Sequence, residues 1–236
     1  MHRFYAPEIA TTMLLPDEEA QHCVRVLRLK EGERIEVVDG RGHLHLCRIL
    51  TANAKNCAVE IERTVDVAPH WECRITVAIA PTKNMDRMEW MAEKVTEMGV
   101  DRIVPLLCRY SERKVLKTER LRKILVSAMK QSLKATLPQL DELTPIGGFL
   151  KNLPDGQRFI AYCDPDIPRR DFVKELAAGS DVTIMVGPEG DFSKEEIRAS
   201  LDAGFIPVSL GDSRLRTETA GTFAVAAIHT LNQLRK

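Results

Sequence analysis

The sequence lacks the features that mark several common classes of protein. Aromatic residues make up only 5% of the 236 residues. The apolar runs stay far short of the roughly 18 residues that suggest a membrane span, and residues 1–8 include no apolar stretch typical of a signal peptide. The 34 basic and 34 acidic residues cancel, so the total charge does not by itself indicate a nucleic-acid partner. We therefore expect a cytoplasmic protein with no membrane association.

The six cysteines exclude two further kinds of site. They are widely spread, and no two form a Cys-x-x-Cys pair. In a chain of this length without a secretory signal, this spacing indicates neither a disulfide framework nor a zinc site. His43 and His45 alternate in a strand-like run and would share one face, but the neighbouring sequence supplies no further ligands. We expect no bound metal, and we interpret most cysteines as small buried apolar residues.

Residues 1–68 have the pattern of a small β-rich unit. A short helix is expected from Pro16 or Asp17 onward. The strand-like runs 34–39 and 43–50, separated by two glycines, predict a hairpin. Residues 56–63 alternate apolar and polar side chains, as in a half-buried strand. These features favour a small β-barrel that presents a surface to a partner, and the fold alone does not identify that partner.

Residues 73–236 alternate predicted strands and helices, which indicates a largely parallel sheet. The spacing of apolar residues predicts a helix from Met85 to Met98, ended by Gly99. Pro105 predicts that the strand over 102–107 lies at an edge or is locally irregular. The strand over 158–163 should precede a helix that reaches about Ala178. A capping box starts another helix at Ser193, and the last helix runs from about Glu218 to Leu234.

The stretch 109–134 is strongly basic in a chain whose total charge is zero. Nine basic residues and two acidic ones give it a net charge of +7, from nine minus two. With only two acids in the stretch, we expect its bases not to be paired along the chain. A charge run is often a solvated helix face, but unpaired positive charge also attracts phosphate backbones. We favour contact with nucleic acid. The bases are Arg109, Arg113, Lys114, Lys117, Arg120, Arg122, Lys123, Lys130 and Lys134.

Two further strand-like runs, Val182–Val186 and Ile206–Leu210, each end in a glycine-containing turn that leads into a helix. Ligands of open α/β sheets bind beyond the carboxyl ends of the strands. The chain has no Gly-x-Gly-x-x-Gly, no phosphate-binding loop with Gly-Lys-Ser/Thr, and no Gly-x-Ser-x-Gly. What remains is a pocket rich in backbone groups, with carboxylates and arginines at its rim. The alternative is that these glycines only shape two helix entries.

The combination of motifs in these turns resembles the RsmE family of ribosomal RNA methyltransferases, which belong to the SPOUT class. Members of this family methylate N3 of a uridine in small-subunit ribosomal RNA with S-adenosylmethionine. Other motifs extend the resemblance over nearly the whole chain. The motifs are Gly187-Pro188-Glu189-Gly190, Leu210-Gly211, Leu215-Arg216-Thr217-Glu218-Thr219-Ala220, Arg3-Phe4-Tyr5, Asp86-Arg87-Met88-Glu89 and Ser111-Glu112-Arg113.

The resemblance implies a two-domain α/β protein that acts as a homodimer. Residues 1–68 would form a PUA-like RNA-binding β-barrel, and residues 73–236 a SPOUT methyltransferase domain with a deep C-terminal trefoil knot. The knotted loops would hold a bent S-adenosylmethionine near the dimer interface. The residues implied around this cofactor are Val186, Gly187, Gly190, Leu210, Gly211 and Leu215.

The resemblance also implies residues for catalysis and for RNA binding. The uridine N3 must lose its proton before it attacks the methyl sulfonium, and Glu189 and Glu218 are the candidate bases. Arg216 would stabilise negative charge that develops on the uracil oxygens. The RNA partner is expected to be small-subunit ribosomal RNA in an assembled or nearly assembled subunit. The residues expected to contact it are Arg25, Arg28, Lys83, Arg113, Lys114 and Arg214.

The chain departs from the family pattern in both turns. Asp191 stands where the family has glycine, and Ser213 stands where it has arginine. Arg214 occupies a position that is normally aliphatic and would face in a different direction from the family arginine. Two rival functions stay open. One is a non-catalytic RNA-binding or ribosome-assembly protein, and the other is a related methyltransferase that acts on a different nucleotide.

Overall fold

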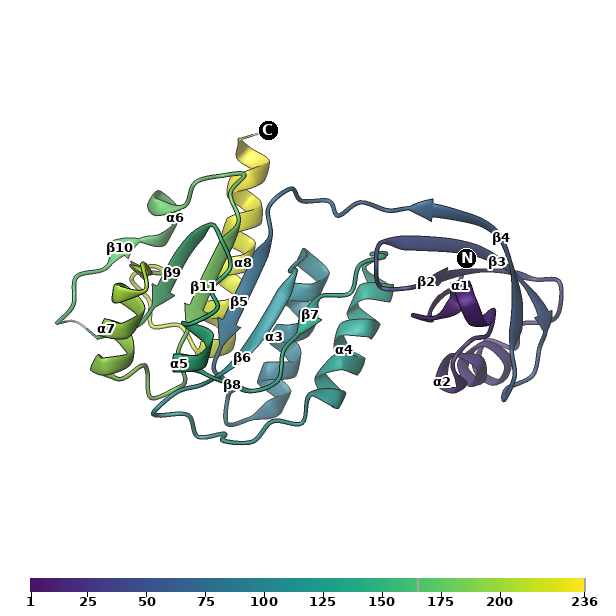
Figure 1. Cartoon of the computed structure of the whole chain (residues 1–236), viewed down its shortest axis with the longest axis horizontal. Helices are drawn as coiled ribbons and strands as arrows, with labels where there is room; N and C mark the ends of the chain where they lie inside the picture. Colours follow the sequence, from purple (N-terminus) through teal and green to yellow (C-terminus); the bar gives the residue numbers. More distant parts are fainter. Residues whose placement is uncertain (165, 236) are drawn as a thin grey trace. The chain divides into compact units, whose positions relative to one another are not determined.

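The structure, a computed structural model, describes residues 1–164 and 166–235 (Figure 1). The chain forms two compact units. The first contains residues 1–70 together with 126–137, and the second contains residues 71–125 and the chain from Pro138 onward. The segment 126–137 was expected in the second unit but belongs to the first.

The first unit is built on a four-stranded sheet in the order β1-β2-β3-β4. Strands β2, β3 and β4 are antiparallel, which confirms the predicted hairpin, and β1 runs parallel to β2. Leu14 forms an isolated bridge with Ala58, so the segment that follows β1 reaches the β4 edge. The elements are β1 (Arg3–Tyr5), α1 (Ile9–Thr12), α2 (Asp17–Gln21), the π-helix η1 (His22–Val26), β2 (Arg34–Val38), β3 (His43–Thr51) and β4 (Ala58–Asp66).

Backbone pairing explains why 126–137 belongs to the first unit. The N–H of Gly42 donates to the carbonyl of Ala135 at 3.1 Å, and the N–H of Leu137 donates to the carbonyl of Gly40 at 2.9 Å. Met129 and Ala135 also pack with Val38 in a small apolar cluster. The hairpin turn thus binds the chain that follows helix α4 (Thr118–Gln131). These long-range contacts leave no trace in the local sequence pattern.

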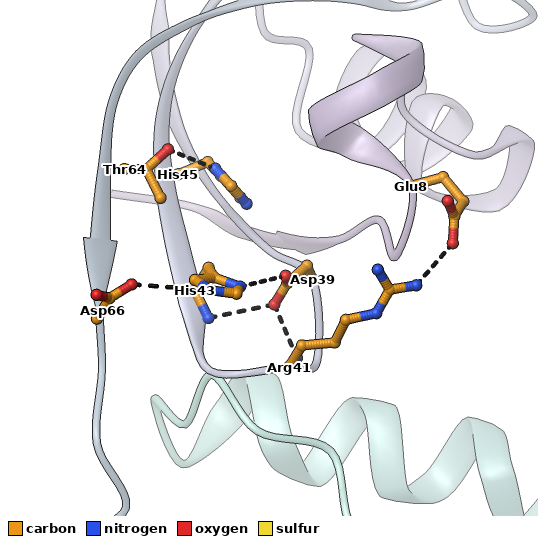
Figure 2. Close-up of polar contacts among 7 residues, drawn as sticks. All are labelled: Glu8, Asp39, Arg41, His43, His45, Thr64 and Asp66. Atoms are coloured by element: carbon orange, nitrogen blue, oxygen red, sulfur yellow. Dashed lines mark hydrogen bonds and ion pairs between the residues drawn. The ribbon is translucent and has the colours of Figure 1, made fainter.

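A polar cluster fixes the same hairpin turn (Figure 2). The buried Asp39 carboxylate accepts hydrogen bonds from the backbone N–H groups of Arg41 and His43, and it lies 2.6 Å from Nδ1 of His43. Burial alone would raise the pKa of Asp39, but these bonds together lower it. On the outer side, Nε2 of His43 lies 3.7 Å from Asp66, and Arg41 reaches Glu8.

The second unit contains an eight-stranded sheet whose strand pairs are all parallel, as predicted. The strands run in the order β10-β12-β9-β11-β5-β6-β7, and β8 also pairs with β6. Their bounds are β5 (Ile75–Ile79), β6 (Arg102–Leu107), β7 (Gln139–Leu140), β8 (Thr144–Pro145), β9 (Gln157–Ala161), β10 (Arg170–Asp171), β11 (Val182–Val186) and β12 (Ile206–Ser209).

The prediction from Pro105 was an edge strand or a local irregularity, and β6 is not an edge strand. On one side of β6, Arg102 and Ile103 pair with β7, whereas Leu106 and Leu107 pair with β8. Pro105 lies between these two pairings, and on the other side of the strand it pairs with Ile79 of β5. The proline therefore marks the point at which β6 changes partners.

Helix α3 (Met85–Met98) has the predicted bounds, and Met88, Met91 and Val95 are buried. It packs against the last helix, α8 (Thr217–Leu234), which also contacts β5 and β11. The remaining helices are α5 (Ile146–Phe149), α6 (Phe172–Glu175) and α7 (Lys194–Asp202). The helix expected to reach Ala178 is wrong in extent, because Leu176 is already extended. Within 1–164 and 166–235, each helix is too short or too polar to cross a membrane.

Candidate cofactor and RNA site

A cavity of about 960 Å³ lies at the carboxyl ends of β9, β11 and β12, with the start of α8 completing its wall. Since β9 lies between β11 and β12 in the sheet, the two glycine turns predicted from the sequence flank the end of a third strand. Most of the predicted site residues line the cavity: Val186, Gly187, Glu189, Leu210, Gly211, Arg214, Leu215, Arg216 and Glu218. Parallel pairing brings these side chains together because it aligns the strand ends at one edge.

The turn after β11 is held from two sides. The hydroxyl of Thr217, at the start of α8, donates to the carbonyl of Gly187 at 3.1 Å. The backbone N–H of Lys83 donates to Oε1 of the exposed Glu189 at 2.9 Å. A Cβ at Gly187 would lie 3.1 Å from the ring of Phe192, so the glycine allows that ring to pack under the turn. The hydrogen bond from Lys83 uses only one of the two carboxylate oxygens of Glu189.

Asp191 ties two walls of the cavity together. Its carboxylate accepts a hydrogen bond from the N–H of Cys163, just beyond β9, at 2.7 Å and another from the N–H of Phe192 at 2.9 Å. Its backbone has a φ of 65°, in the left-handed region that glycine adopts most easily. This conformation accounts for the glycine of the family pattern. Aspartate tolerates it better than most residues, and here its side chain adds two bonds that glycine lacks.

The turn after β12 is open toward the cavity. Gly211 has a φ of 117°, and a Cβ there would have no atom within 4 Å, so this residue needs glycine for its backbone and not for lack of space. The Ser209 hydroxyl donates to the carbonyl of Gly211 at 2.9 Å. Arg214 and Arg216 are exposed, and the side chain of neither forms a hydrogen bond or ion pair within the described part of the chain. Both guanidinium groups are therefore available to a ligand.

Glu218 is the buried carboxylate of the site. It is 8% exposed, lies in the first turn of α8, and faces Arg87 at 3.8 Å. The Glu218 carboxylate thus lies between the positive end of the helix dipole and a guanidinium group. Glu189 and Glu218 thus border one cavity in different surroundings, the first exposed and the second buried.

Tyr162 and Arg169 line the cavity although the sequence offered no motif for them. Arg169 donates to the carbonyl of Tyr162 at 2.7 Å, and its guanidinium lies 5.9 Å from the centre of the Tyr162 ring. The Tyr162 hydroxyl is buried without a hydrogen-bond partner among the described residues, and burial raises its pKa. The two residues are seven positions apart, and no local sequence pattern links them.

The expectation that the bases of 109–134 are unpaired is wrong for several of them. Arg120 forms a two-oxygen ion pair with Glu89, and Lys130 pairs with Glu19. Arg113 donates to the carbonyls of Thr82 and Lys83. The acids come from distant parts of the sequence, which a count within one stretch does not include.

Other predicted RNA-binding residues are exposed. Lys114 forms no ion pair within the described residues, whereas Lys83 lies 3.6 Å from Glu112. In the first unit, Arg25 lies in the π-helix and Arg28 adopts a φ of 56°. Gly190 differs from the other predicted cofactor residues, because it lies against Tyr110 and does not line the cavity.

Two family models match the chain. Residues 69–229 match an RNA methyltransferase domain, and residues 15–62 match an RNA methyltransferase PUA domain. Ribosomal RNA small subunit methyltransferase E of Rickettsia conorii is 27% identical over 222 residues, which cover 92% of this chain and 89% of the relative. The chain belongs to the RsmE family of ribosomal RNA methyltransferases.

Solved structures agree with this membership of the RsmE family. A crystal structure described as a probable rRNA-methyltransferase from Porphyromonas gingivalis is 47% identical, with a TM-score of 0.94 and coverage of 100% of both chains. A ribosomal RNA small subunit methyltransferase E from Neisseria gonorrhoeae, solved with S-adenosyl methionine bound, is 29% identical. Its TM-score is 0.85, with coverage of 98% of both chains. The fold is therefore the PUA-like sheet followed by the parallel α/β sheet of the SPOUT class.

Proposed function

We propose that this RsmE family member transfers the methyl group of S-adenosylmethionine to N3 of a uridine in small-subunit (16S) ribosomal RNA. The observation that carries the proposal is the cavity at the ends of β9, β11 and β12, where backbone-lined turns meet Glu189, Arg216 and Glu218. The relative from Neisseria gonorrhoeae binds S-adenosyl methionine, and this chain aligns with nearly all of it.

The cavity suits such a cofactor in size and in chemistry. Its volume of about 960 Å³ lies within the range of roughly 300–1,000 Å³ that is usual for small-molecule sites. Gly211 leaves open space where a side chain would project, and the buried Tyr162 hydroxyl offers an unused polar group. Bound S-adenosylmethionine supplies a methyl group activated by the sulfonium. The residues that would hold it are Val186, Gly187, Leu210, Gly211 and Leu215, with Gly190 shaping the turn beside them.

The base that removes the N3 proton is assigned to Glu189 in preference to Glu218. The Glu189 side chain is exposed, and only one of its oxygens is used by the N–H of Lys83. Glu218 is buried beside Arg87 and is better placed to orient that arginine at the cavity wall. A base must first be within reach of the proton that it takes, which favours the exposed carboxylate.

Arg216 and Arg214 are assigned to the RNA side of the site. Both line the cavity, and both side chains are exposed without an internal partner in the described structure. A guanidinium directed at the uracil would stabilise negative charge on its carbonyl oxygens as N3 is deprotonated. Five further basic residues are assigned to contacts with the RNA backbone: Lys83, Arg113, Lys114, Arg25 and Arg28. The contact of Arg113 would be less direct, because its guanidinium also holds the 82–83 segment.

The remaining assignments follow from the family. The substrate places the enzyme in the cytoplasm, with the ribosomal subunit as partner. A homodimer is supported by exposed aromatic residues on the two packed helices, Trp90 on α3 and Phe223 on α8. A trefoil knot is supported by the path of the chain. Strand β12 lies on the far side of β9 from β11, and the helix that follows it, α8, returns to pack on β5 and β11.

Mass mapping of 16S ribosomal RNA tests the proposal most directly. RNA from a strain that lacks the gene should lose one methyl group on a uridine base, and complementation should restore it. Calorimetry with purified protein should show binding of S-adenosylmethionine. Unchanged RNA together with no cofactor binding would instead support a non-catalytic RNA-binding protein, and a lost methyl group on another nucleotide would support a different target.

A further inference from the structure

An exposed aromatic ring lies beside the proposed catalytic turn without a role in the cavity. Tyr110 is 52% exposed, and it directly precedes Ser111 in the segment that follows β6. A Cβ built on Gly190 would lie 3.0 Å from the Cβ of Tyr110, so Gly190 is the surface on which Tyr110 rests. Since Gly190 follows Glu189 in the chain, the ring is held next to the proposed base.

Hydrogen bonds hold the turn that carries Tyr110. The N–H of Ser111 donates to the carbonyl of Cys108 at 3.1 Å, and the N–H of Cys108 donates to the Ser111 hydroxyl at 3.0 Å. The N–H of Arg109 donates to Oε1 of Glu196 at 2.7 Å. Glu196 is itself fixed by the capping box with Ser193 at the start of α7. An exposed ring on a fixed turn loses little conformational freedom when a ligand covers it.

The charge around the ring favours RNA as the occupant. Arg109 precedes Tyr110 and is exposed, and Lys114 follows four residues later, also exposed. Lys83 and Arg113 are joined by the hydrogen bond from the Arg113 guanidinium to the Lys83 carbonyl. Lysine, here Lys83 and Lys114, is depleted at protein–protein interfaces, whereas single-stranded RNA is bound by aromatic rings that stack on bases and by basic groups that hold phosphates.

We propose that Tyr110 is a stacking platform for an unpaired base of the ribosomal RNA, next to the uridine that is methylated. The inference rests on the proposed function, since it supplies a positioning contact for that substrate. A stacked base would fix the RNA strand at the rim, so that the target base enters the cavity beside Glu189. The Tyr110 ring would act on RNA affinity and not on the cofactor.

The test compares Tyr110→Ala, Tyr110→Phe and the control Val115→Ala. Alanine keeps the Cβ that faces Gly190 and removes only the ring, so the turn should persist. Val115 is an exposed apolar residue of the same segment, at 73% exposure, and controls for loss of surface area. Binding of unmethylated small ribosomal subunits is measured by filter retention with S-adenosylhomocysteine present, which prevents methyl transfer. Cofactor affinity is measured by calorimetry.

For Tyr110→Ala we expect the Kd and the KM for subunits to rise on the order of ten-fold, as is usual for a lost stacking contact. Tyr110→Phe should retain wild-type affinity, and all three variants should keep the affinity for S-adenosylmethionine. Unchanged subunit binding by Tyr110→Ala would overturn the inference, and so would a change in dimerisation alone, which would indicate a protein partner. If the unaltered protein neither binds the cofactor nor methylates subunits, the proposed function itself fails.

Discussion

The carboxylate of Asp191 accepts a hydrogen bond from the backbone N–H of Cys163 at 2.7 Å, which joins the turn after β11 to the end of β9. Both segments line the cavity, so this bond sets the distance between two of its walls. Asp191→Gly would relieve the strain of the left-handed backbone conformation but would remove the hydrogen bond from Cys163. We expect a several-fold loss of S-adenosylmethionine affinity, with stability changed by no more than about 1 kcal/mol, because the two effects oppose each other.

Asp191→Asn and Asp191→Ala separate the effect of the hydrogen bond to Cys163 from the effect of the negative charge. Asparagine tolerates positive φ and keeps one acceptor oxygen, so it should restore most of the affinity. Alanine loses both bonds and is strained at this φ of 65°, and we expect it to destabilise the protein by about 1–3 kcal/mol. Calorimetry and thermal unfolding measure the two quantities. If all three Asp191 variants bind S-adenosylmethionine as tightly as the unaltered protein does, the two walls of the cavity are held in place without Asp191.

Gly211 can be tested for a role in cofactor binding if the effect of backbone strain is measured separately in a control variant. Gly211→Ala and Gly179→Ala each place a Cβ at positive φ, 117° and 76°, with no atom within 4 Å. Both should destabilise the protein by about 1–2 kcal/mol. Only Gly211 lines the cavity, so only Gly211→Ala should weaken binding of S-adenosylmethionine in calorimetry. Weakening by both variants would point to strain and not to a contact.

The turns of this site were predictable because their signals are local. Glycines, the Ser193–Glu196 capping box and the apolar runs of β11 and β12 each act within a few residues. Tyr162 and Arg169 were not predictable, since their place on the cavity wall depends on β9 lying between β11 and β12. Strand order is a property of the whole sheet, and no short segment of sequence contains it. The same holds for Lys130, whose partner Glu19 is 111 residues away.

The proposed base is tested by Glu189→Gln and Glu218→Gln. Glutamine keeps an oxygen that can accept from the N–H of Lys83, so the turn after β11 should stay in place. If Glu189 removes the proton, Glu189→Gln should lower kcat by about 10²–10⁴-fold and should change its pH dependence. Glu218→Gln should keep the wild-type shape of the pH profile. Stopped methyl-transfer assays on small subunits over a pH series measure both.

The reverse pattern would transfer the role to Glu218. Both variants must retain affinity for S-adenosylmethionine, because a variant that has lost the cofactor reports on binding and not on proton removal. Wild-type rates for Glu189→Gln across the pH series, with the cofactor bound, would eliminate Glu189 as the base.

Lys114 and Lys130 differ in their surroundings and should therefore differ in their effect on RNA binding. Lys114 is exposed without an ion pair in the described part of the chain, whereas Lys130 is paired with Glu19. Lys114→Gln should reduce the slope of log K against log salt by about 1, as for one lost phosphate contact. Lys130→Gln should lower stability and leave the slope unchanged. Filter binding of subunits from low to high salt provides the slopes, and an unaltered slope for Lys114→Gln would remove that residue from the interface.

The hairpin turn of the first unit should make stability depend on pH through His43. The hydrogen bond to Asp39, and then its charge, raise the pKa of His43, and the more distant Asp66 acts in the same direction while Arg41 opposes it. A raised pKa means that the folded protein binds the proton more tightly than the unfolded chain. The stability gained is complete below the unfolded value near 6.5 and is lost as pH rises through the folded pKa. His43→Gln should therefore cost more stability at about pH 5.5 than at about pH 8.5.

His45, two residues along the same strand, should show the opposite dependence. It is buried at 4% exposure, its Nδ1 lies 2.9 Å from the Thr64 hydroxyl, and burial lowers its pKa. The folded protein therefore resists protonation of His45, and acidification below about 6.5 favours the unfolded chain. The stability deficit of His45→Gln should thus shrink as pH falls, while that of His43→Gln grows. Urea unfolding of both variants and of the exposed-residue control His70→Gln at the two pH values measures this contrast. Parallel curves for His43→Gln and His45→Gln would show that the Asp39 contact and the burial of His45 do not shift the two pKa values in opposite directions.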